Sequence, residues 1–263
     1  MNVETLINNS KPFLEYVLSW EANLPELLLK DVIHDPSSTA IVSVDVINGF
    51  CYEGALASPR VQAIISPIVD IFKQGQAMGV ENIILAQDNH EADDIEFNSY
   101  PPHCVRGTEE SESVPEFQEL DFYSDMVVIE KNSISATIDT KFGAWLDSHP
   151  EVTTFIVVGD CTDLCTYQLA MGIHLRGNAR NIEQRVVLPA NCVATYDMSV
   201  SDAQEFGAVP HDGDLLHHIF LYSMMLNGVE VVKSLSSANR ASDFPILPFR
   251  NLIILDAYKS QPV

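Results

Sequence analysis

Short apolar runs that are rich in β-branched residues recur along this chain, and segments with helical periodicity separate them. The runs comprise Ala40–Val44, Asn82–Ala86, Met126–Glu130, Thr154–Val158, Gln184–Leu188 and Glu230–Val232. Continuous hydrophobic runs of this length are typical of parallel strands that are buried on both faces. The alternation therefore predicts an α/β fold with three layers, α-β-α, around a mostly parallel six-stranded sheet.

Residues 1–35 precede this alternation and predict a helical extension. Its aromatic residues Phe13 and Trp20 are expected to dock on the main body, which leaves 36–263 as a single domain. The proline-containing tail is expected to wrap irregularly around that domain; its prolines are Pro245, Pro248 and Pro262. Helices are expected at 61–78, 140–148, 164–177 and 212–226.

Composition narrows the class of partner. Hydrophobic residues make up 46% of the 263 residues, enough for a full core, and the net charge is −23. Such acidity repels nucleic acid and anionic membranes, and no apolar run approaches the roughly 20 residues that span a bilayer. The five cysteines are an odd number, and no secretory leader is visible, so free thiols in a reducing cytoplasmic compartment are expected. The expected partner is a small molecule.

Chargeable side chains follow four consecutive predicted strands. They are Asp45, Asp88, Lys131 and, one turn beyond its strand, Cys165. The carboxyl ends of parallel strands meet at one edge of the sheet, where α/β proteins bind ligands. A single charge at a strand end needs no function, because charges end strands. Four such groups together favour an active site.

The segment from Phe155 to Cys165 places a cysteine at a helix start. Gly159 permits an abrupt exit from the strand, and Thr162 and Asp163 are good helix-cap residues. Backbone N–H groups and the helix dipole are expected to favour the Cys165 thiolate and to hold an oxyanion. The plainer interpretation is a small cysteine that fills space behind the sheet. A redox or metal pair with Cys161 is disfavoured, since no second pair exists.

An acid, a base and a thiol together suit acyl transfer. Asp45 would take the thiol proton and later protonate the leaving amine, and Lys131 would favour both anions by its charge. Cys165 would attack a carbonyl to form a thioester that water then releases. Alternatively, Asp45 and Lys131 form a buried structural ion pair, and the sequence leaves this open.

The long loop after the second strand carries a second group of functional residues. Asp88 and His90 are spaced to point the same way from an extended chain, and the stiff Pro101–Pro102 pair precedes His103. Glu96 lies between them and adds a carboxylate. Nitrogen and oxygen donors without a thiolate suit Zn²⁺, Mn²⁺ or Fe²⁺. The alternative is a solvated acidic loop with two incidental histidines.

These motifs together resemble the isochorismatase-like cysteine hydrolases, and most of all the plant-type nicotinamidases within them. The resemblance extends from Ala40 to Val232. It rests on 45–51 (DVINGFC), 88–90 (DNH), 101–108 (PPHCVRGT), Lys131, 159–165 (GDCTDLC), 192–197 (CVATYD) and 215–222 (LLHHIFLY). The element at 101–108 is highly specific, whereas the element at 159–165 is typical of the whole superfamily.

The resemblance implies roles for particular residues. Asp45, Lys131 and Cys165 would form a catalytic triad, and the backbone N–H groups of Cys161 and Cys165 would form the oxyanion hole. A cis peptide bond would fall between Asp160 and Cys161. The implied reaction is the hydrolysis of nicotinamide to nicotinate and ammonia, as part of NAD metabolism.

The resemblance also implies a metal and a binding pocket. Asp88, His90 and His103 would bind a divalent metal, usually zinc-like, that contacts the pyridine nitrogen, and Glu96 matches a further ligand. The ring walls would be Phe50 and Tyr100. Family members are typically homo-oligomers, so the same is expected here.

The chain departs from the bacterial nicotinamidases at three positions. Ile47 stands where many carry Gln, Gly49 where they carry Asp, and Glu96 where other members carry His. Two alternatives therefore stay open. One is a cysteine hydrolase of another small amide or carbamoyl compound, and the other is a non-catalytic protein on the same fold.

Overall fold

A parallel β-sheet forms the middle layer of the protein. A computed structural model describes residues 1–237, and its main sheet has seven strands. Six of them follow the order β4-β3-β2-β5-β6-β8, and the short β7 pairs with the end of β5. Their bounds are β2 Thr39–Val44, β3 Asn82–Asp88, β4 Val127–Lys131, β5 Thr154–Asp160, β6 Arg185–Pro189, β7 Val193–Ala194 and β8 Glu230–Val232. The α/β fold with a parallel sheet is as predicted.

Two strands lie at the centre of the sheet and are buried along most of their length. Every residue of β2 is buried, and β5 is buried from Phe155 to Asp160. The two pair in parallel, with Val42 beside Val157. Burial on both faces explains why both strands read as continuous apolar runs in the sequence. The two-residue β7 is too short to show any hydrophobic period, so it was not predicted.

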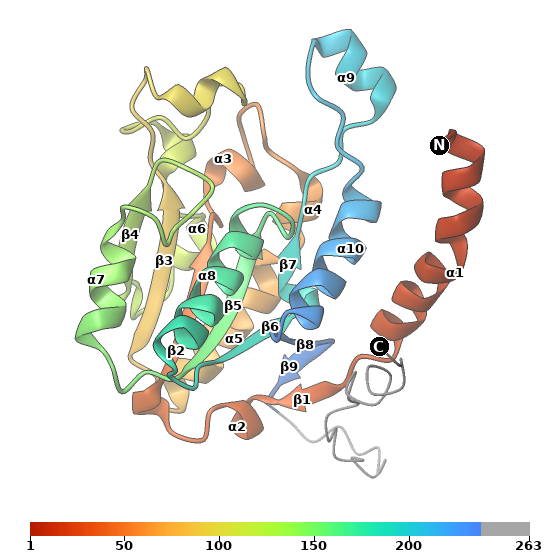
Figure 1. The fold of residues 1–263 in the computed structure, drawn as a ribbon. Helices are drawn as coiled ribbons and strands as arrows, with labels where there is room; N and C mark the ends of the chain where they lie inside the picture. Colours follow the sequence, from red (N-terminus) through yellow and green to blue (C-terminus); the bar gives the residue numbers. More distant parts are fainter. Residues whose placement is uncertain (238–263) are drawn as a thin grey trace, which may run out of the picture.

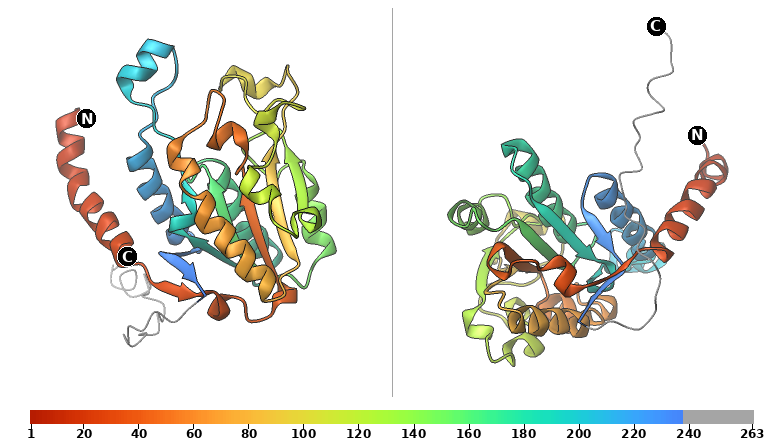
Figure 2. Two further views of the ribbon diagram at one scale, coloured as in Figure 1. Left: turned by 180° about the vertical axis from the view of Figure 1, so that it is seen from behind. Right: turned by 90° about the horizontal axis from the view of Figure 1, so that it is seen from below.

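Helices cover both faces of the sheet, so the molecule has three layers (Figures 1 and 2). One face carries α7 (Lys141–Ser148), α8 (Cys165–Arg180) and α10 (Gly213–Leu226). The opposite face carries α5 (Ile65–Ala77) together with the short helices α2 (Leu29–Val32) and α6 (Pro115–Gln118). Each face has its own aliphatic and aromatic core. Apart from α1 at the N-terminus, the remaining helices are α3 (Asn48–Cys51), α4 (Pro59–Gln62) and α9 (Val200–Phe206). The 3-10 turns are Pro36–Ser38, Ile95–Asn98, Glu109–Ser111, Tyr123–Asp125 and Ala190–Cys192.

The helix predicted over residues 61–78 is two helices, α4 and α5. The break falls at residues 63 and 64, and Pro67 occupies the third position of α5. Proline has no N–H, so it cannot donate to the carbonyl of Ala63 and continue one helix across this point. In the first turn of a new helix the missing N–H has no intrahelical acceptor to lose.

The N-terminal segment forms a helical arm that contacts α10. Helix α1 (Val3–Ala22) stands apart from the body at its N-terminal end (Figure 1). Its rings Phe13, Tyr16 and Trp20 surround Tyr222 of α10 edge-on, at centroid distances of 5.3, 5.9 and 5.4 Å. The predicted contacts of Phe13 and Trp20 are therefore present.

The predicted helical extension over residues 1–35 also contains a strand. Residues Glu26–Leu28 form strand β1, which pairs in parallel with β9 (Ser234–Ser236) in a separate two-stranded sheet. This pairing joins segments that lie about two hundred residues apart, so no local pattern reports it. The tail predicted to wrap irregularly, with Pro245, Pro248 and Pro262, lies outside the described residues.

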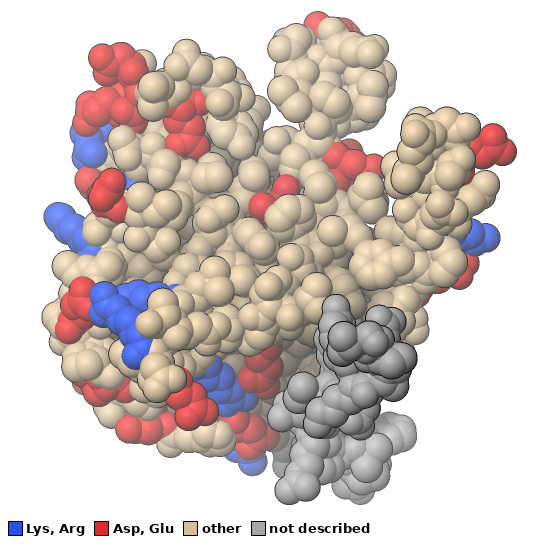
Figure 3. All heavy atoms as spheres, in the orientation of Figure 1, with Lys and Arg blue, Asp and Glu red and all other residues tan. Residues whose placement is uncertain are grey.

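The surface reflects the acidic composition. On the face shown in Figure 3, acidic side chains are spread around the periphery and the middle carries few charges. None of the helices within residues 1–237 combines the length and apolar character that crossing a bilayer requires. All five cysteines are free, as predicted, and all five are buried.

Candidate active site

The structure brings the predicted strand-end residues to one place at the carboxyl edge of the sheet. Asp45 directly follows β2, Asp88 ends β3, Lys131 ends β4, and Cys165 is the first residue of α8. Asp88 and Lys131 are also register partners in neighbouring strands. Adjacent parallel strands thus place their last side chains side by side, because their carboxyl ends share an edge.

The Lys131 ammonium group lies at the centre of these residues. Its Nζ is 2.7 Å from Asp45 Oδ2, 2.5 Å from Asp88 Oδ1 and 3.6 Å from Cys165 Sγ, and it donates to the carbonyl of Ser133 at 3.1 Å. Asp45 Oδ1 accepts a hydrogen bond from the Asp88 N–H at 2.9 Å. The Lys131 side chain has no exposed surface, so water screens these interactions little.

Burial sets the proton affinities of these groups. Burial raises the pKa of Asp45 to about 6, with a further rise from the Asp88 charge that Lys131 opposes. Burial favours the neutral amine of Lys131, but the charges of Asp45 and Asp88 outweigh it and hold the Lys131 pKa well above its usual value. Lysine therefore stays protonated between two carboxyl groups.

The predicted thiolate at the helix start is not supported. Burial raises the pKa of Cys165 well above that of a free thiol, and the nearby Lys131 charge lowers it only in part. Cys165 is 6% exposed, so its anion loses hydration that the helix start does not replace. The thiol instead donates a hydrogen bond to Asp45, which acts on Asp45 to lower its pKa. Its proton therefore already faces a carboxyl group with a raised pKa.

In the turn before Cys165, one position has a backbone conformation that only glycine can adopt. Gly159 has φ +119°, and a Cβ there would lie 2.0 Å from the carbonyl oxygen of Val44. The peptide bond between Asp160 and Cys161 is cis, as the resemblance implies. In the turns and caps of the described residues, no hydrogen bond uses the N–H of Cys161 or Cys165.

The predicted helix caps act elsewhere. Leu164 is the N-cap of α8 and makes no side-chain cap, so the prediction for Thr162 and Asp163 is wrong. The Thr162 hydroxyl lies 2.9 Å from His217 Nδ1 on α10. Asp163 accepts from Thr195 Oγ1 at 2.6 Å and pairs with His211 Nε2 at 2.8 Å. Both residues thus join the turn to later parts of the chain.

His211 and Tyr196 are site residues that the sequence analysis missed. His211 Nδ1 lies 2.9 Å from the Tyr196 carbonyl oxygen, and the two rings stack at 4.0 Å. Burial opposes protonation of His211, but the hydrogen bond and charge of Asp163 outweigh it and raise the His211 pKa. Burial acts to raise the pKa of Asp163, but hydrogen bonds from His211 and Thr195 outweigh it and lower that pKa. A His–Asp contact 48 residues apart has no local signal.

Three of the four predicted metal ligands form a buried cluster. Donor atoms of Asp88, His90 and His103 all lie within 4.8 Å of one another. Each histidine Nε2 is 3.6 Å from an Asp88 oxygen, and the opposite Nδ1 atoms contact Asp94 Oδ2 at 3.1 Å and the Pro101 carbonyl at 2.8 Å. Such outer contacts leave Nε2 of each ring for a metal. His90 Nε2 is buried without a hydrogen-bond partner in the described part of the chain. The donor set and this unpaired nitrogen fit a divalent ion.

The fourth predicted ligand, Glu96, is outside this cluster. It lies in a 3-10 turn and lines the wall of the neighbouring cavity. Burial raises the Glu96 pKa, and the Asp88 charge adds to this rise. Spacing in the sequence did not predict this separation, because the path of the loop between His90 and His103 decides which of its side chains reach the cluster.

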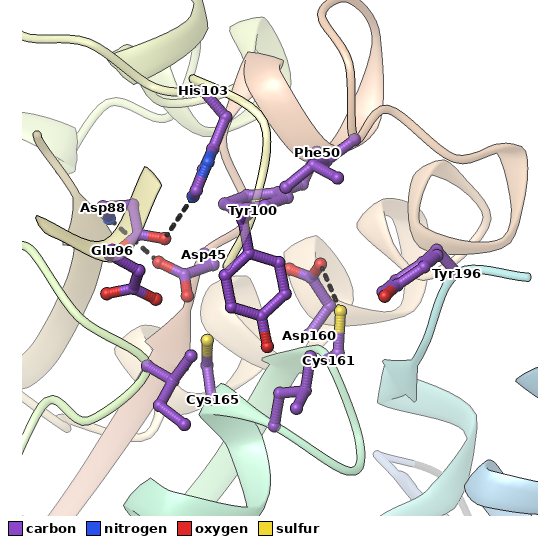
Figure 4. A pocket seen from close by; sticks show the side chains of 13 residues that line it. Asp45, Phe50, Asp88, Glu96, Tyr100, His103, Asp160, Cys161, Cys165 and Tyr196 are labelled. Atoms are coloured by element: carbon purple, nitrogen blue, oxygen red, sulfur yellow. Dashed lines mark hydrogen bonds and ion pairs between the residues drawn. The ribbon is translucent and has the colours of Figure 1, made fainter. Parts of the chain in front are cut away.

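A cavity opens beside the thiol and reaches the metal cluster (Figure 4). Its empty volume is about 380 Å³, a figure that includes the open mouth. The predicted ring walls Phe50 and Tyr100 both line it. Further apolar and aromatic lining comes from Leu56, Ile134, Leu164 and Tyr196. The arrangement suits the attack of a thiol on a small planar carbonyl compound.

Comparison with known proteins agrees with this geometry. The isochorismatase domain family matches residues 39–209. Nicotinamidase 1 of Arabidopsis thaliana is 30% identical over 221 residues, which cover 78% of this chain and 89% of that protein. These similarities indicate a nicotinamidase or a related hydrolase of the same family that acts on a small molecule.

Solved structures share the fold. The pyrazinamidase of Pyrococcus horikoshii, solved in complex with zinc, has a TM-score of 0.57 and 22% identity, covering 74% of this chain and 99% of that one. The N-carbamoylsarcosine amidase of Thermoplasma acidophilum has a TM-score of 0.57 and 20% identity, covering 78% and 99%. At such identities the likeness concerns the fold alone. The domain match and the plant relative decide the family: this chain belongs to the isochorismatase family.

Proposed function

We propose that this protein is a cysteine-dependent amidase that hydrolyses nicotinamide to nicotinate and ammonia. One observation carries the proposal: Lys131 Nζ lies 2.7 Å from Asp45 and 3.6 Å from Cys165 Sγ, at a cavity that also reaches a buried Asp–His–His cluster. The 30% identity to a plant nicotinamidase supports the choice of substrate.

The first half of the reaction forms a thioester. As Cys165 Sγ bonds to the amide carbon, its proton passes to Asp45, whose pKa of about 6 leaves it ionised but basic at neutral pH. The carbonyl electron pair moves to oxygen, where the N–H groups of Cys161 and Cys165 face it. Asp45 then gives the proton to the amide nitrogen, the C–N bond breaks, and ammonia leaves.

The second half restores the enzyme. Asp45 takes a proton from water as the water oxygen bonds to the thioester carbon. The C–S bond then breaks, the acid is released, and the sulfur regains its proton from Asp45. Lys131 stays charged throughout, since two carboxyl groups hold its proton, and its charge offsets the negative charge that builds on sulfur.

Asp88, His90 and His103 would hold a divalent ion, with zinc favoured and Mn²⁺ or Fe²⁺ as alternatives. Such an ion supplies a Lewis-acid contact for the pyridine nitrogen and so fixes the ring. Phe50 and Tyr100 would pack against the ring, and Glu96 would add a polar group at its edge.

The test is ammonia release from nicotinamide by purified protein loaded with zinc. Cys165→Ala is expected to lower kcat by at least about 10³-fold, because the nucleophile is removed. Cys192→Ala is the matched control, since Cys192 is equally buried and free but does not line the cavity. Activity that survives Cys165→Ala, or an active wild type with no preference for pyridine carboxamides, would contradict the proposal.

A further inference from the structure

Asp160 is a buried carboxyl group that the proposed mechanism does not use. It is the last residue of β5, is 1% exposed and lines the cavity. Its Oδ2 accepts a weak hydrogen bond from the Cys161 thiol at 3.5 Å. Its Oδ1 has no hydrogen-bond partner among residues 1–237. A buried polar atom left unpaired costs about 1–3 kcal/mol, so an unpaired carboxyl oxygen at a binding cavity calls for a partner.

The surroundings of Asp160 favour its uncharged form. Burial raises the pKa of Asp160 well above its usual value, and the Asp45 charge adds to this rise. Within the described residues no lysine, arginine or histidine forms an ion pair with it. A neutral carboxyl group both donates and accepts a hydrogen bond, whereas the apolar residues around it do neither.

Asp160 occupies a separate end of the cavity. Figure 4 shows its carboxyl group beside Cys161, with Tyr196 beyond, on the side of Cys165 away from Asp88 and Glu96. The cavity therefore has two polar ends with the thiol between them. One end carries the metal cluster, and the other carries Asp160. A purely structural role for Asp160 explains its contact with Cys161 and leaves Oδ1 without a function.

We propose that Asp160 hydrogen-bonds directly to the substrate and selects small carboxamides that carry a second polar group at the end of the molecule away from Asp88, His90 and His103. This inference rests on the proposed function for the identity of the reacting group. The substrates in question are ring compounds that carry a carboxamide group and, in addition, an amino or hydroxyl substituent.

The experiment compares matched ligands that differ in one group. Nicotinamides with an amino or a methyl substituent at the same ring position have nearly equal size, but only the amino group forms a hydrogen bond. Dissociation constants are measured by calorimetry in zinc-loaded Cys165→Ala protein, which binds without turnover. At one ring position at least, the amino compound is expected to bind tighter than the methyl compound.

Variants of Asp160 then test whether this residue causes the preference for the amino over the methyl compound. Asp160→Leu in the same background is expected to reduce the amino-over-methyl ratio by about 10–100-fold, because the hydrogen bond is lost. Asp160→Asn keeps a donor and an acceptor, and is expected to hold the ratio within a few-fold. Ile134→Val, which alters an apolar wall of the same cavity, is expected to leave the ratio unchanged.

Two results would overturn the inference. One is an amino-over-methyl ratio that Asp160→Leu leaves unchanged at every ring position. The other is a large loss of stability in both Asp160→Leu and Asp160→Asn, measured as a fall in the urea midpoint, which would assign Asp160 a structural role. Because binding is measured without turnover, a wild type that binds these ligands but releases no ammonia contradicts the proposed function and leaves the binding result standing.

Discussion

Two polar networks flank Cys165, and they differ in how their charges are balanced. Around Lys131 one cation lies between two carboxyl groups, Asp45 and Asp88, and all three side chains are buried. Around Asp163 one carboxylate has two donors, Thr195 and His211, at 2.6 and 2.8 Å. The first network has an excess of negative charge, and the second is fully paired.

This difference in charge balance suggests different roles for the two networks. Burial, and second to it the Asp88 charge, raises the pKa of Asp45 to about 6 despite the Lys131 charge, which suits a group that exchanges protons. The pairing around Asp163 lowers its pKa, so this carboxylate keeps its charge and its hydrogen bonds over the neutral range. We infer that the Lys131 network performs chemistry, whereas the Asp163 network holds the turn from Cys161 to Cys165 in place.

The largest effect is expected from the centre of the first network. Lys131→Met removes the cation that lies between Asp45 and Asp88, so kcat should fall by at least about 10³-fold. The free energy of unfolding should fall by about 3–5 kcal/mol, because two buried carboxyl groups lose their partner. Ammonia release and urea unfolding measure the two effects.

Lys233→Met is the control for that substitution. Lys233 pairs with Glu26 at 3.2 Å, but both side chains are more than half exposed, and exposed pairs contribute about 1 kcal/mol or less. If Lys131→Met and Lys233→Met lowered the free energy of unfolding equally, the expected difference between a buried and a solvated ion pair would be contradicted.

An intermediate effect is expected from metal removal. A chelator should lower the thermal midpoint of unfolding and abolish activity, and added zinc should restore both. The midpoint changes because an ion at about 100 times its Kd raises the free energy of unfolding by about 2.7 kcal/mol. His90→Ala should lose the zinc-dependent rise in midpoint, because it removes a buried donor of the cluster. His211→Ala should keep that rise, because His211 belongs to the other network. A rise that is the same in all variants would place the ion elsewhere.

The smallest effect is a pH-dependent difference in stability from the His211–Asp163 pair. The folded-state pKa of His211 is raised, so its contribution is full below the unfolded pKa of about 6.5 and is lost as pH rises through the folded pKa. The Asp163 pKa is lowered, so its contribution is present above about 3.9 and is lost as pH falls through the folded pKa. The pair therefore contributes most between these limits.

His211→Asn should thus lower the free energy of unfolding by about 1–2 kcal/mol near pH 5.5, and by less near pH 9. Urea unfolding of wild type and variant at both pH values measures the difference, and groups that titrate equally in both proteins cancel. If the difference in unfolding free energy between wild type and variant grew toward pH 9, its pH dependence would be opposite to the expected one and would contradict the ion pair.

Local patterns in the sequence predicted the parallel strands and the residues at their ends. Burial on both faces makes strands such as β2 and β5 continuously apolar, and charged residues mark their ends. The rule that such ends share an edge was then enough to place Asp45, Asp88 and Lys131 together. The pairing of β1 with β9 escaped prediction, because the two strands lie far apart along the chain. The helix break before Pro67 was missed although its cause is local, since the proline without an N–H is visible in the sequence.

The proton affinity of the Cys165 thiol could also not be predicted from the sequence. A cysteine at a helix start predicts a thiolate, but burial reverses the direction and raises the Cys165 pKa. Glu96 was expected among the metal donors and lines the cavity instead. The sequence could predict neither feature, because solvent exclusion and distance are properties of the packed molecule.

The sequence by itself determined the fold, the family and the residue types that gather at the carboxyl edge, because hydrophobic periodicity and strand ends are local properties of the chain. Only the tertiary structure decided which acids are paired, which nitrogen of each histidine is free, and that Asp163 meets His211 and Asp160 faces the cavity. Those features depend on contacts between distant segments and on the exclusion of water, which arise when the chain packs.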